Sequence, residues 1–411
     1  MLASSTATPL ARAVCKSAVR PIFCRLFGSE PLLKTAFCEM HKELGGKMVP
    51  FAGYELPVEY AGENGGIKKE HLWCREEGKA ALFDVSHMGQ IRWDGKDAGD
   101  FLEKMVVGDI KGLGAGEGRL SLITNEDGGI VDDTVITNAG DYIYMVVNGA
   151  CKVGDMEHFN KHLADFSGDC TMTYMEDLQL LALQGTGAAE VLAPLVSLDL
   201  AKMNFMTGVD TTIAGIEGCR VTRCGYTGED GFELSVPSAS AVSLAQTLLQ
   251  NSAVNPTGLG ARDSLRLEAG LCLYGNDIDG STNPVEAALA WTMGGPKGRR
   301  RQEQGFLGAD KFLTPEGKLK AQARKRVGIA GMKAPARSHV EIYDAAGEAK
   351  IGEITSGTFS PSLGKPVAMG YVDKAHSKDG TDITVKIRGK TQPAQVTKMP
   401  FVEQRYFKPT A

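Results

Sequence analysis

The sequence has no run of about 18 consecutive apolar residues, so we expect no segment to span a membrane. It has no excess of basic residues either, because 45 Lys and Arg stand against 50 Asp and Glu, a formal net charge of -5. This balance argues against nucleic acid and anionic membranes as partners. None of the nine cysteines forms a CxxC pair and their number is odd, which excludes a zinc ribbon and a secreted disulfide framework. We therefore expect reduced, mostly buried thiols.

What is present is an ordinary globular composition, with 43% hydrophobic and 23% charged residues. The length of 411 residues suggests two or three domains. Glycine is abundant, at 50 residues, which favours many tight turns, as in β-rich domains.

The first 29 residues differ from the rest of the chain because they contain no acidic residue. Arg12, Lys16 and Arg20 recur every four positions and would share one face of a helix. Basic residues, several serines and no acids are typical of an organelle transit peptide, whereas a secretory signal needs an uninterrupted apolar core. We predict a mitochondrial transit peptide over residues 1–30 and location in the matrix. The alternative is a disordered basic tail.

Residues 120–271 contain both antiparallel strand patterns and helix patterns. Residues 120–147 read as three strands joined by turns, a β-meander, and residues 218–236 read as a hairpin. Apolar spacing predicts helices over 239–250, with Ser238 as a cap, and over 261–271. Helices mixed with antiparallel hairpins indicate an α+β fold.

Two further segments follow residues 31–295. Residues 296–326 are rich in Lys and Arg and are predicted to be a basic linker. Residues 327–411 contain short strand-like runs separated by Gly and Pro turns, which predicts a small β-barrel or jelly roll.

Several familiar motifs fail on inspection. The segment 112–118 lacks GxGxxG spacing, and Thr384 stands where a phosphate loop ending at 389–391 requires glycine. His158 and His162 lie four residues apart but lack the glutamate of an HExxH zinc site. No GxSxG nucleophile motif is present. We therefore predict neither a metal nor a nucleotide site.

Polar residues stand where a core prefers apolar ones. Asp132 and Asp133 lie in the middle of a predicted strand, so one of them must share a face with Val131 and Val135. Glu233 lies between Phe232 and Leu234 in another strand. A buried carboxylate must be paired, bound to ligand or open to a cleft. Two interpretations remain open, a buried pair between a carboxylate and Arg262, and a ligand site.

Seven blocks of sequence, in order, closely resemble the T-protein of the glycine cleavage system, the aminomethyltransferase family. They are GGKMVPFAGYELPVEY (45–60), LFDVSHMG (82–89), TNEDGGIVDDTVIT (124–137), RCGYTGEDGFELSV (223–236), ARDSLRLEAGLCLYGNDID (261–279), NPVEAALAWTMG (283–294) and KMPFV (398–402). The similarity runs from about Leu32 to the C-terminus.

The resemblance implies three domains in a cloverleaf around a central folate channel, two of them interleaved α+β domains with antiparallel sheets and the third the C-terminal barrel. The implied reaction moves the methylene carbon from an aminomethyl group on the dihydrolipoyl arm of H-protein to tetrahydrofolate. Its products are ammonia and 5,10-methylenetetrahydrofolate. Tetrahydrofolate is then the co-substrate, no metal or nucleotide is needed, and the lipoylated H-protein and the other subunits of the system are the implied partners.

The resemblance also implies roles for residues. Asp133 matches the family's essential aspartate near the reactive pterin nitrogens, where a carboxylate can stabilise cationic carbon and steer protons. Glu233 matches the pterin-binding glutamate, whose two oxygens suit the parallel N–H donors of the pyrimidinone edge. Arg262 matches the substrate-binding arginine. Asn148 matches a position near the pterin.

Further contacts are implied at the edges of the site. Met88 and Tyr226 match residues packed on the ring, with core packing as the alternative, and Tyr406 matches a folate-contacting position. Arg405 is an alternative contact for the glutamate tail of the folate. The KGRRR run at 297–301 suits an acidic carrier surface, with a solvated linker as its alternative.

Two other functions share the folate-binding fold. Sarcosine and dimethylglycine oxidoreductases add a flavin domain, for which the residues before the similarity leave no room. A non-catalytic folate-binding protein related to iron–sulfur assembly factors carries a KGC-type motif, but no lysine precedes Cys272 here. Asp133 also favours chemistry over binding alone.

Overall fold

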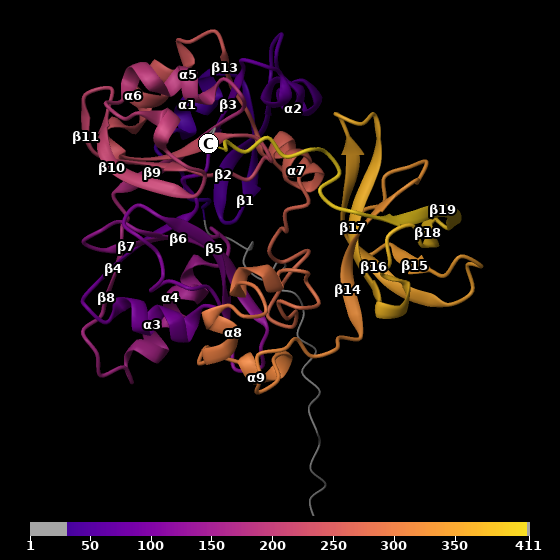
Figure 1. Cartoon of the computed structure of the whole chain (residues 1–411). Coiled ribbons are helices and arrows are strands. Elements are labelled where there is room, and N and C mark those ends of the chain that lie inside the picture. The colour runs from indigo at the N-terminus through magenta and orange to yellow at the C-terminus, as the bar shows by residue number, and fades with distance from the viewer. Residues whose placement is uncertain (1–30, 409–411) are drawn as a thin grey trace, which may run out of the picture. The chain divides into compact units, whose positions relative to one another are not determined.

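The computed structural model describes residues 31–408, of which Leu32 onward belongs to a single unit (Figure 1). The predicted transit peptide, residues 1–30, lies outside the described residues. Within residues 31–408, no helix has the length and apolar character needed to cross a bilayer. The described chain opens with α1 (Cys38–Glu43), the hairpin of β1 (Gly46–Phe51) and β2 (Tyr54–Tyr60), and α2 (Ile67–Arg75).

A five-stranded antiparallel sheet has the order β5-β6-β7-β4-β8. Its strands are β4 (Gly89–Asp94), β5 (Gly118–Thr124), β6 (Ile130–Asn138), β7 (Ile143–Val147) and β8 (Thr171–Tyr174), and the helices α3 (Ala98–Met105) and α4 (Lys152–Leu163) accompany it. The predicted meander over 120–147 is confirmed as β5, β6 and β7. Trp93 of β4 packs against Phe101 of α3 and Phe159 of α4, so the two helices bury the apolar face of the sheet.

A six-stranded sheet has the order β10-β11-β12-β9-β3-β13, with only the β13–β3 pair parallel. Its strands are β3 (Ala80–Asp84), β9 (Leu178–Gln184), β10 (Thr207–Ile213), β11 (Ile216–Arg223), β12 (Gly231–Pro237) and β13 (Val254–Pro256). The predicted hairpin over 218–236 is confirmed as β11 and β12. Short helices α5 (Ala188–Leu192), η2 (Ala193–Leu195) and η3 (Leu200–Lys202) lie between β9 and β10.

Helix α6 (Ser238–Leu249) confirms the helix predicted over 239–250 and packs its apolar residues into the core of the six-stranded sheet. The predicted cap is wrong, because Pro237 is the N-cap residue and makes no side-chain cap. The Ser238 hydroxyl instead donates to the carbonyl of Asp177 at 2.8 Å, which ties the start of the helix to the residue directly before β9.

Helix α7 (Leu259–Glu268) is shorter than the predicted 261–271. The helix ends because Gly270 takes a positive φ of 73° and donates its N–H to the carbonyl of Leu267 at 3.0 Å. A side chain at Gly270 would also crowd Met399, whose Cβ lies 3.0 Å from the position of an added Cβ. The chain after α7 is therefore held close to the segment that follows the barrel.

The stretch predicted as a basic linker is folded. It contains α8 (Arg299–Glu303) and α9 (Ala309–Phe312), and η4 (Ala290–Met293) precedes it. Phe306 and Phe312 are buried in a core cluster with Leu122 of β5. Arg300 and Arg301 are only 3% and 7% exposed, so the KGRRR run is not a solvated linker.

The C-terminal part confirms the predicted barrel. Six strands close it in the order β14-β17-β16-β15-β18-β19. They are β14 (Arg324–Ala330), β15 (Glu341–Tyr343), β16 (Lys350–Ser360), β17 (Lys365–Asp373), β18 (Asp382–Ile387) and β19 (Lys390–Thr397), with η5 (Lys374–His376) after β17. Inward-facing aliphatic residues fill the interior, so it is a packed core and leaves no lumen for a ligand.

Candidate active site

A cavity of about 730 Å³ lies where these parts meet. This is within the roughly 300–1,000 Å³ of typical small-molecule sites. Its wall comes from the meander, from the β11–β12 hairpin with the end of α7, and from the barrel with the tail that follows it. All seven site residues predicted from the sequence line it. They are Met88, Asp133, Asn148, Tyr226, Glu233, Arg262 and Tyr406.

Strand alternation separates the two adjacent aspartates. Asp132 is fully buried on the core side of β6, and its two carboxylate oxygens accept hydrogen bonds from the backbone N–H and the side-chain amide of Asn148, both at 2.8 Å. Asp133 lies on the opposite face, in the cavity wall with Val135. The Asn148 amide also donates to Asp133 Oδ1 at 3.0 Å. Asn148, which also lines the cavity, therefore fixes the orientation of Asp133.

The charge environment of Asp133 is unusual. Burial, together with the nearby negative charge of Asp132, raises the pKa of Asp133 to about 7. The hydrogen bond from Asn148 and the positive charge of Arg262 act in the opposite direction. Asp155, fully buried in the first turn of α4, is a third carboxyl in this group, and burial holds its pKa well above the usual range. The cavity carboxyl therefore titrates near neutral pH.

Glu233 and Arg262 enter the cavity from different elements, β12 and α7. Among residues 31–408, these two side chains form no ion pair with each other, so the interpretation as a purely structural pair is wrong. The Arg262 guanidinium carbon instead lies 4.7 Å from the centre of the Tyr226 ring. Burial raises the pKa of Glu233, and the Cys224 thiol and Arg262 oppose this shift. Both charged groups remain available to a ligand.

Aromatic residues border the same space. Tyr226 donates its hydroxyl to the carbonyl of Cys272, which fixes its ring beside Arg262. Tyr406 stacks on Phe205, with ring centres 4.1 Å apart and planes inclined by 23°. Sequence reasoning missed Phe205, because it precedes β10 in a segment without any motif and only the folded tail brings it to Tyr406.

Trp291 was also missed as a site residue, although it lies in a block that carries the family resemblance. It is 60% exposed and also lines the cavity, so it lies where the cavity meets solvent. Only the folded structure shows that this side chain is both exposed and part of the cavity wall. In the sequence, a lone tryptophan in a helical pattern is interpreted as a core residue.

The structure corrects the suggestion that Arg405 contacts a folate tail. Arg405 is not part of the cavity wall. Its guanidinium donates to Glu229 at 2.7 Å and to the backbone carbonyl of Arg75 at 2.6 Å. Its charge is therefore used within the protein.

Within residues 31–408, no three His, Cys, Asp or Glu side chains are grouped so that they could hold a metal ion. The rings of His158 and His162 lie 5.0 Å apart, and His158 hydrogen-bonds the carbonyl of Thr124 at 3.1 Å. The seven described cysteines are free, and burial raises the pKa of the cavity-lining Cys224 thiol well above its usual range.

Comparisons with known proteins agree with one another. Residues 37–297 match the family model of the GCVT N-terminal domain, and residues 324–403 match that of the glycine cleavage T-protein C-terminal barrel domain. The mitochondrial aminomethyltransferase of Dictyostelium discoideum is 48% identical over 392 residues, covering 92% of this chain and 95% of that protein. That of Gallus gallus is 48% identical over 402 residues, covering 96% and 99%. The crystal structure of the glycine cleavage system aminomethyltransferase T from Bartonella henselae superposes with a TM-score of 0.84 at 40% identity, covering 92% of this chain and 100% of that one.

Proposed function

The chain belongs to the aminomethyltransferase family, the T-proteins of the glycine cleavage system, and from that membership we propose how its cavity serves the family's reaction. The protein is an aminomethyltransferase of glycine cleavage. The alternative, a non-catalytic folate-binding protein related to iron–sulfur assembly factors, is not favoured, because relatives at 48% identity over nearly the whole chain are named aminomethyltransferases.

Tetrahydrofolate fits the residues of the cavity as the co-substrate. Glu233 offers two carboxylate oxygens to a ligand edge with parallel N–H donors, and the Arg262 guanidinium beside it balances that charge. Tyr226 and Met88 give apolar surface for a planar ring. When bound, tetrahydrofolate supplies the nitrogens that receive the one-carbon unit.

The observation that carries the proposal is the Asp133 carboxyl, which lies in the cavity wall, is held by Asn148 and has a pKa near neutrality. Ionised, it stabilises positive charge that develops beside it. Because it titrates near the working pH, it can also accept or return a proton at its own oxygen. Asp132, turned into the core, has no such access.

We propose that the aminomethyl donor is the lipoylated H-protein and that the other subunits of the system are assembly partners. We propose that its arm enters the cavity beside Trp291, which lines the cavity and is exposed to solvent. The KGRRR run does not provide a free basic docking surface, because Arg299 pairs with Glu103 and Asp109 and the next two arginines are buried. Only Lys297 of the run is exposed.

A reconstituted assay tests the function. The protein is mixed with aminomethylated lipoyl carrier, and ammonia and methylenetetrahydrofolate are followed with and without tetrahydrofolate. Release of ammonia is expected to accelerate by orders of magnitude with tetrahydrofolate. Equal rates in the two mixtures would exclude the transferase reaction.

Location in the mitochondrial matrix is also a proposal. The relatives are named mitochondrial, and residues 1–30 have the composition of a transit peptide. Import into isolated mitochondria, with the full chain against one starting at Pro31, tests it. Equal protection of both chains from added protease would contradict a transit peptide.

Replacing Glu233 by Gln should raise the dissociation constant for tetrahydrofolate about 10- to 100-fold, since a charged double acceptor becomes one acceptor and one donor. Equilibrium titration measures the constant. Glu217→Gln, an exposed glutamate on the neighbouring strand β11, is the matched control and should bind as the wild type does. An unchanged constant in the Glu233 variant would remove this residue from the binding site.

The pH dependence of turnover should report Asp133. With a pKa raised to about 7, the carboxyl is protonated in acid, so turnover should fall about tenfold per pH unit well below pH 7 and level off above it. Steady-state turnover between pH 5.5 and 9 measures the profile. The residual activity of an Asp133→Asn variant should lack this inflection, and an inflection that persists would assign it to another group.

A further inference from the structure

The tail after the barrel returns to the six-stranded sheet and α7. In Figure 1 the described part of this tail, in yellow, runs from the barrel past α7. The backbone N–H of Phe401 donates to the carbonyl of Glu268 at 2.8 Å, and that of Arg405 donates to the carbonyl of Gly228 at 2.8 Å. The side chain of Gln404 donates to the carbonyl of Ala269 at 3.1 Å. The tail is thus attached to both α7 and the hairpin loop.

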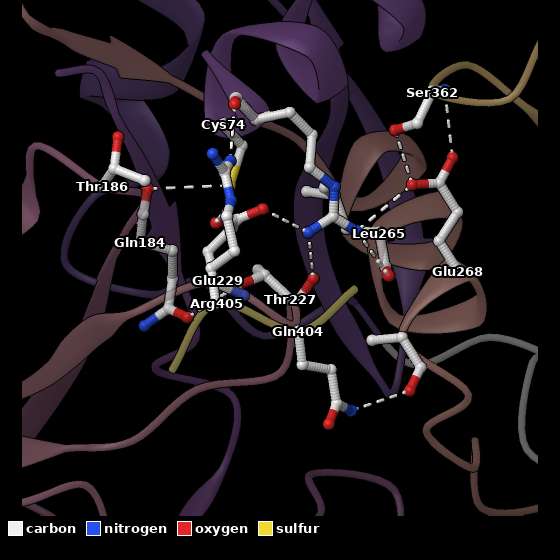
Figure 2. A network of polar contacts seen from close by, with 12 residues as sticks. Cys74, Gln184, Thr186, Thr227, Glu229, Leu265, Glu268, Ser362, Gln404 and Arg405 are labelled. Carbon is white, nitrogen blue, oxygen red and sulfur yellow. Dashed lines mark hydrogen bonds and ion pairs between the residues drawn. The ribbon is translucent and has the colours of Figure 1, made fainter. Parts of the chain in front are cut away.

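Side-chain charges continue this attachment into the protein interior (Figure 2). Arg405 Nε donates to Glu229 Oε2 at 2.7 Å, and Arg75 Nη1 donates to Glu229 Oε1 at 2.7 Å. Arg75 Nη2 donates to Glu268 Oε2 at 3.2 Å. We name these four residues, Arg405, Glu229, Arg75 and Glu268, the ion-pair network.

Glu268, the member of the ion-pair network farthest from Arg405 along the chain of contacts, is bound to the barrel. Ser360 and Ser362, at the end of β16 and just after it, donate their hydroxyls to Glu268 at 2.5 and 2.7 Å. His71 of α2 lies 3.1 Å from the same carboxylate. Although burial acts against ionisation, the hydrogen bonds from His71 and the two serines lower the pKa of Glu268 to about 2. Glu268 is therefore ionised.

The two carboxylates of the ion-pair network are buried, and the network is balanced in charge. Glu229 and Glu268 are 1% and 0% exposed, and two arginines face these two carboxylates. Removing one member of such a set leaves an incompletely paired charge in the interior, which is strongly unfavourable. The position of Arg405 is therefore determined by the body of the protein, not by the tail itself.

The residues on either side of Arg405 form part of the cavity wall. Gln404 and Tyr406 both line it, and Tyr406 stacks on Phe205 there. Phe407 is fixed in turn, with its ring 3.7 Å from the guanidinium carbon of Arg223. Among Gln404, Arg405, Tyr406 and Phe407 of the described tail, Arg405 is the residue that forms an ion pair with a buried carboxylate, that of Glu229.

We propose that Arg405 and Glu229 are positioning residues, which hold Tyr406 in the cavity wall so that this wall is complete before the folate co-substrate binds. The inference rests on the proposed function and deepens it. Arg405 touches no ligand in this arrangement and acts only through Tyr406. Loss of the ion-pair network should therefore weaken the binding of tetrahydrofolate and leave Asp133 and its supporting Asn148 in place.

The test replaces Arg405 by Met, which keeps length and removes charge. The KM for tetrahydrofolate should rise about 5- to 30-fold, while kcat changes less than about threefold, since a displaced wall residue affects binding. Arg405→Lys, which keeps the charge, should recover part of the loss. Lys408→Met, an exposed lysine on the same tail, is the matched control and should behave as wild type.

A double-variant cycle shows whether Arg405 acts through Tyr406. Tyr406→Ala with Arg405→Met should raise KM no more than Tyr406→Ala alone. Additive effects, or an unchanged KM in Arg405→Met, would overturn the inference. Arg405→Met with Glu229→Gln removes the unpaired charge, so it should regain melting temperature but not KM, which separates positioning from general instability.

Failure of the positioning role of Arg405 can be distinguished from failure of the proposed function. If wild-type protein releases ammonia no faster with tetrahydrofolate, the function fails whatever Arg405 does. If the wild type is active and the Arg405→Met variant has an unchanged KM, only the positioning role fails.

Discussion

Asp133→Asn is expected to lose about 10²- to 10⁴-fold in turnover, while the dissociation constant for tetrahydrofolate changes less than a few-fold. The amide keeps the size of the side chain and can still bond Asn148, but it carries no charge and accepts no proton at neutral pH. Single-turnover ammonia release and equilibrium titration measure the two quantities separately. A variant whose main defect is folate binding would make Asp133 a residue of substrate placement.

Two controls accompany this variant. Asp141→Asn, an exposed aspartate in the turn between β6 and β7, should turn over as wild type. Stability gives the second control, because the pKa of Asp133 is raised from 3.8 to about 7 in the folded protein. The proton is then retained in the folded state but lost from the unfolded state between these pH values, so this group's stabilisation disappears as pH rises through 7.

The Asp133→Asn variant avoids that loss. At pH 8 its free energy of unfolding should exceed that of the wild type by about 1–3 kcal/mol, and the difference should shrink toward pH 4. Urea unfolding at the two pH values measures it. A variant that is inactive yet more stable cannot owe its inactivity to misfolding.

The second large effect is expected for Arg300→Met, which should lower the free energy of unfolding by about 3–5 kcal/mol. Arg300 is 3% exposed. It donates from Nε to the carbonyl of Gly108 and from Nη2 to that of Val106, both at 3.0 Å. It also bonds the carbonyl of Gln304 at 3.2 Å. Methionine fills similar space but leaves these carbonyls without donors.

Lys297→Met is the matched control for Arg300→Met, because it removes an exposed charge from the same basic run. It should change the free energy of unfolding by less than about 0.5 kcal/mol. Chemical unfolding followed by circular dichroism compares the two. Equal, small effects would mean that Arg300 is not the residue that holds α8 against the loop after α3.

The sequence was most informative where a motif combined an unusual residue with a regular element. The face on which Asp133 lies follows from the period of two along β6, once the strand is recognised. Glu233 stands out for the same reason, between apolar neighbours in β12. Pairing of Glu233 with Arg262 was left open, and only the side-chain geometry excludes it, since residues on a strand and a helix can be near one another without forming an ion pair.

The basic run was misread because charge in a sequence does not reveal burial. The five N–H groups of a guanidinium can be satisfied by backbone carbonyls of ordinary loops, as around Arg300. The carbonyls of Val106 and Gly108 are 194 and 192 positions earlier in the chain, so the sequence around Arg300 does not indicate this burial. Arg405 was misassigned for a related reason. Its partner Glu229 lies 176 positions earlier, and nothing local connects the two. Contacts of such separation come from tertiary packing alone.

Because the cavity wall is assembled from the meander, the hairpin and the tail, the binding site can form only late in the synthesis of the described chain. Tyr406 follows the meander, the hairpin and the barrel in chain order, so a chain that stops before this residue, or has not yet grown to it, has no finished pocket. Such fragments should be unable to sequester reduced folate from molecules that contain the tail, and the ability to bind it should arise in one step, when Gln404 and Tyr406 dock against the rest of the wall.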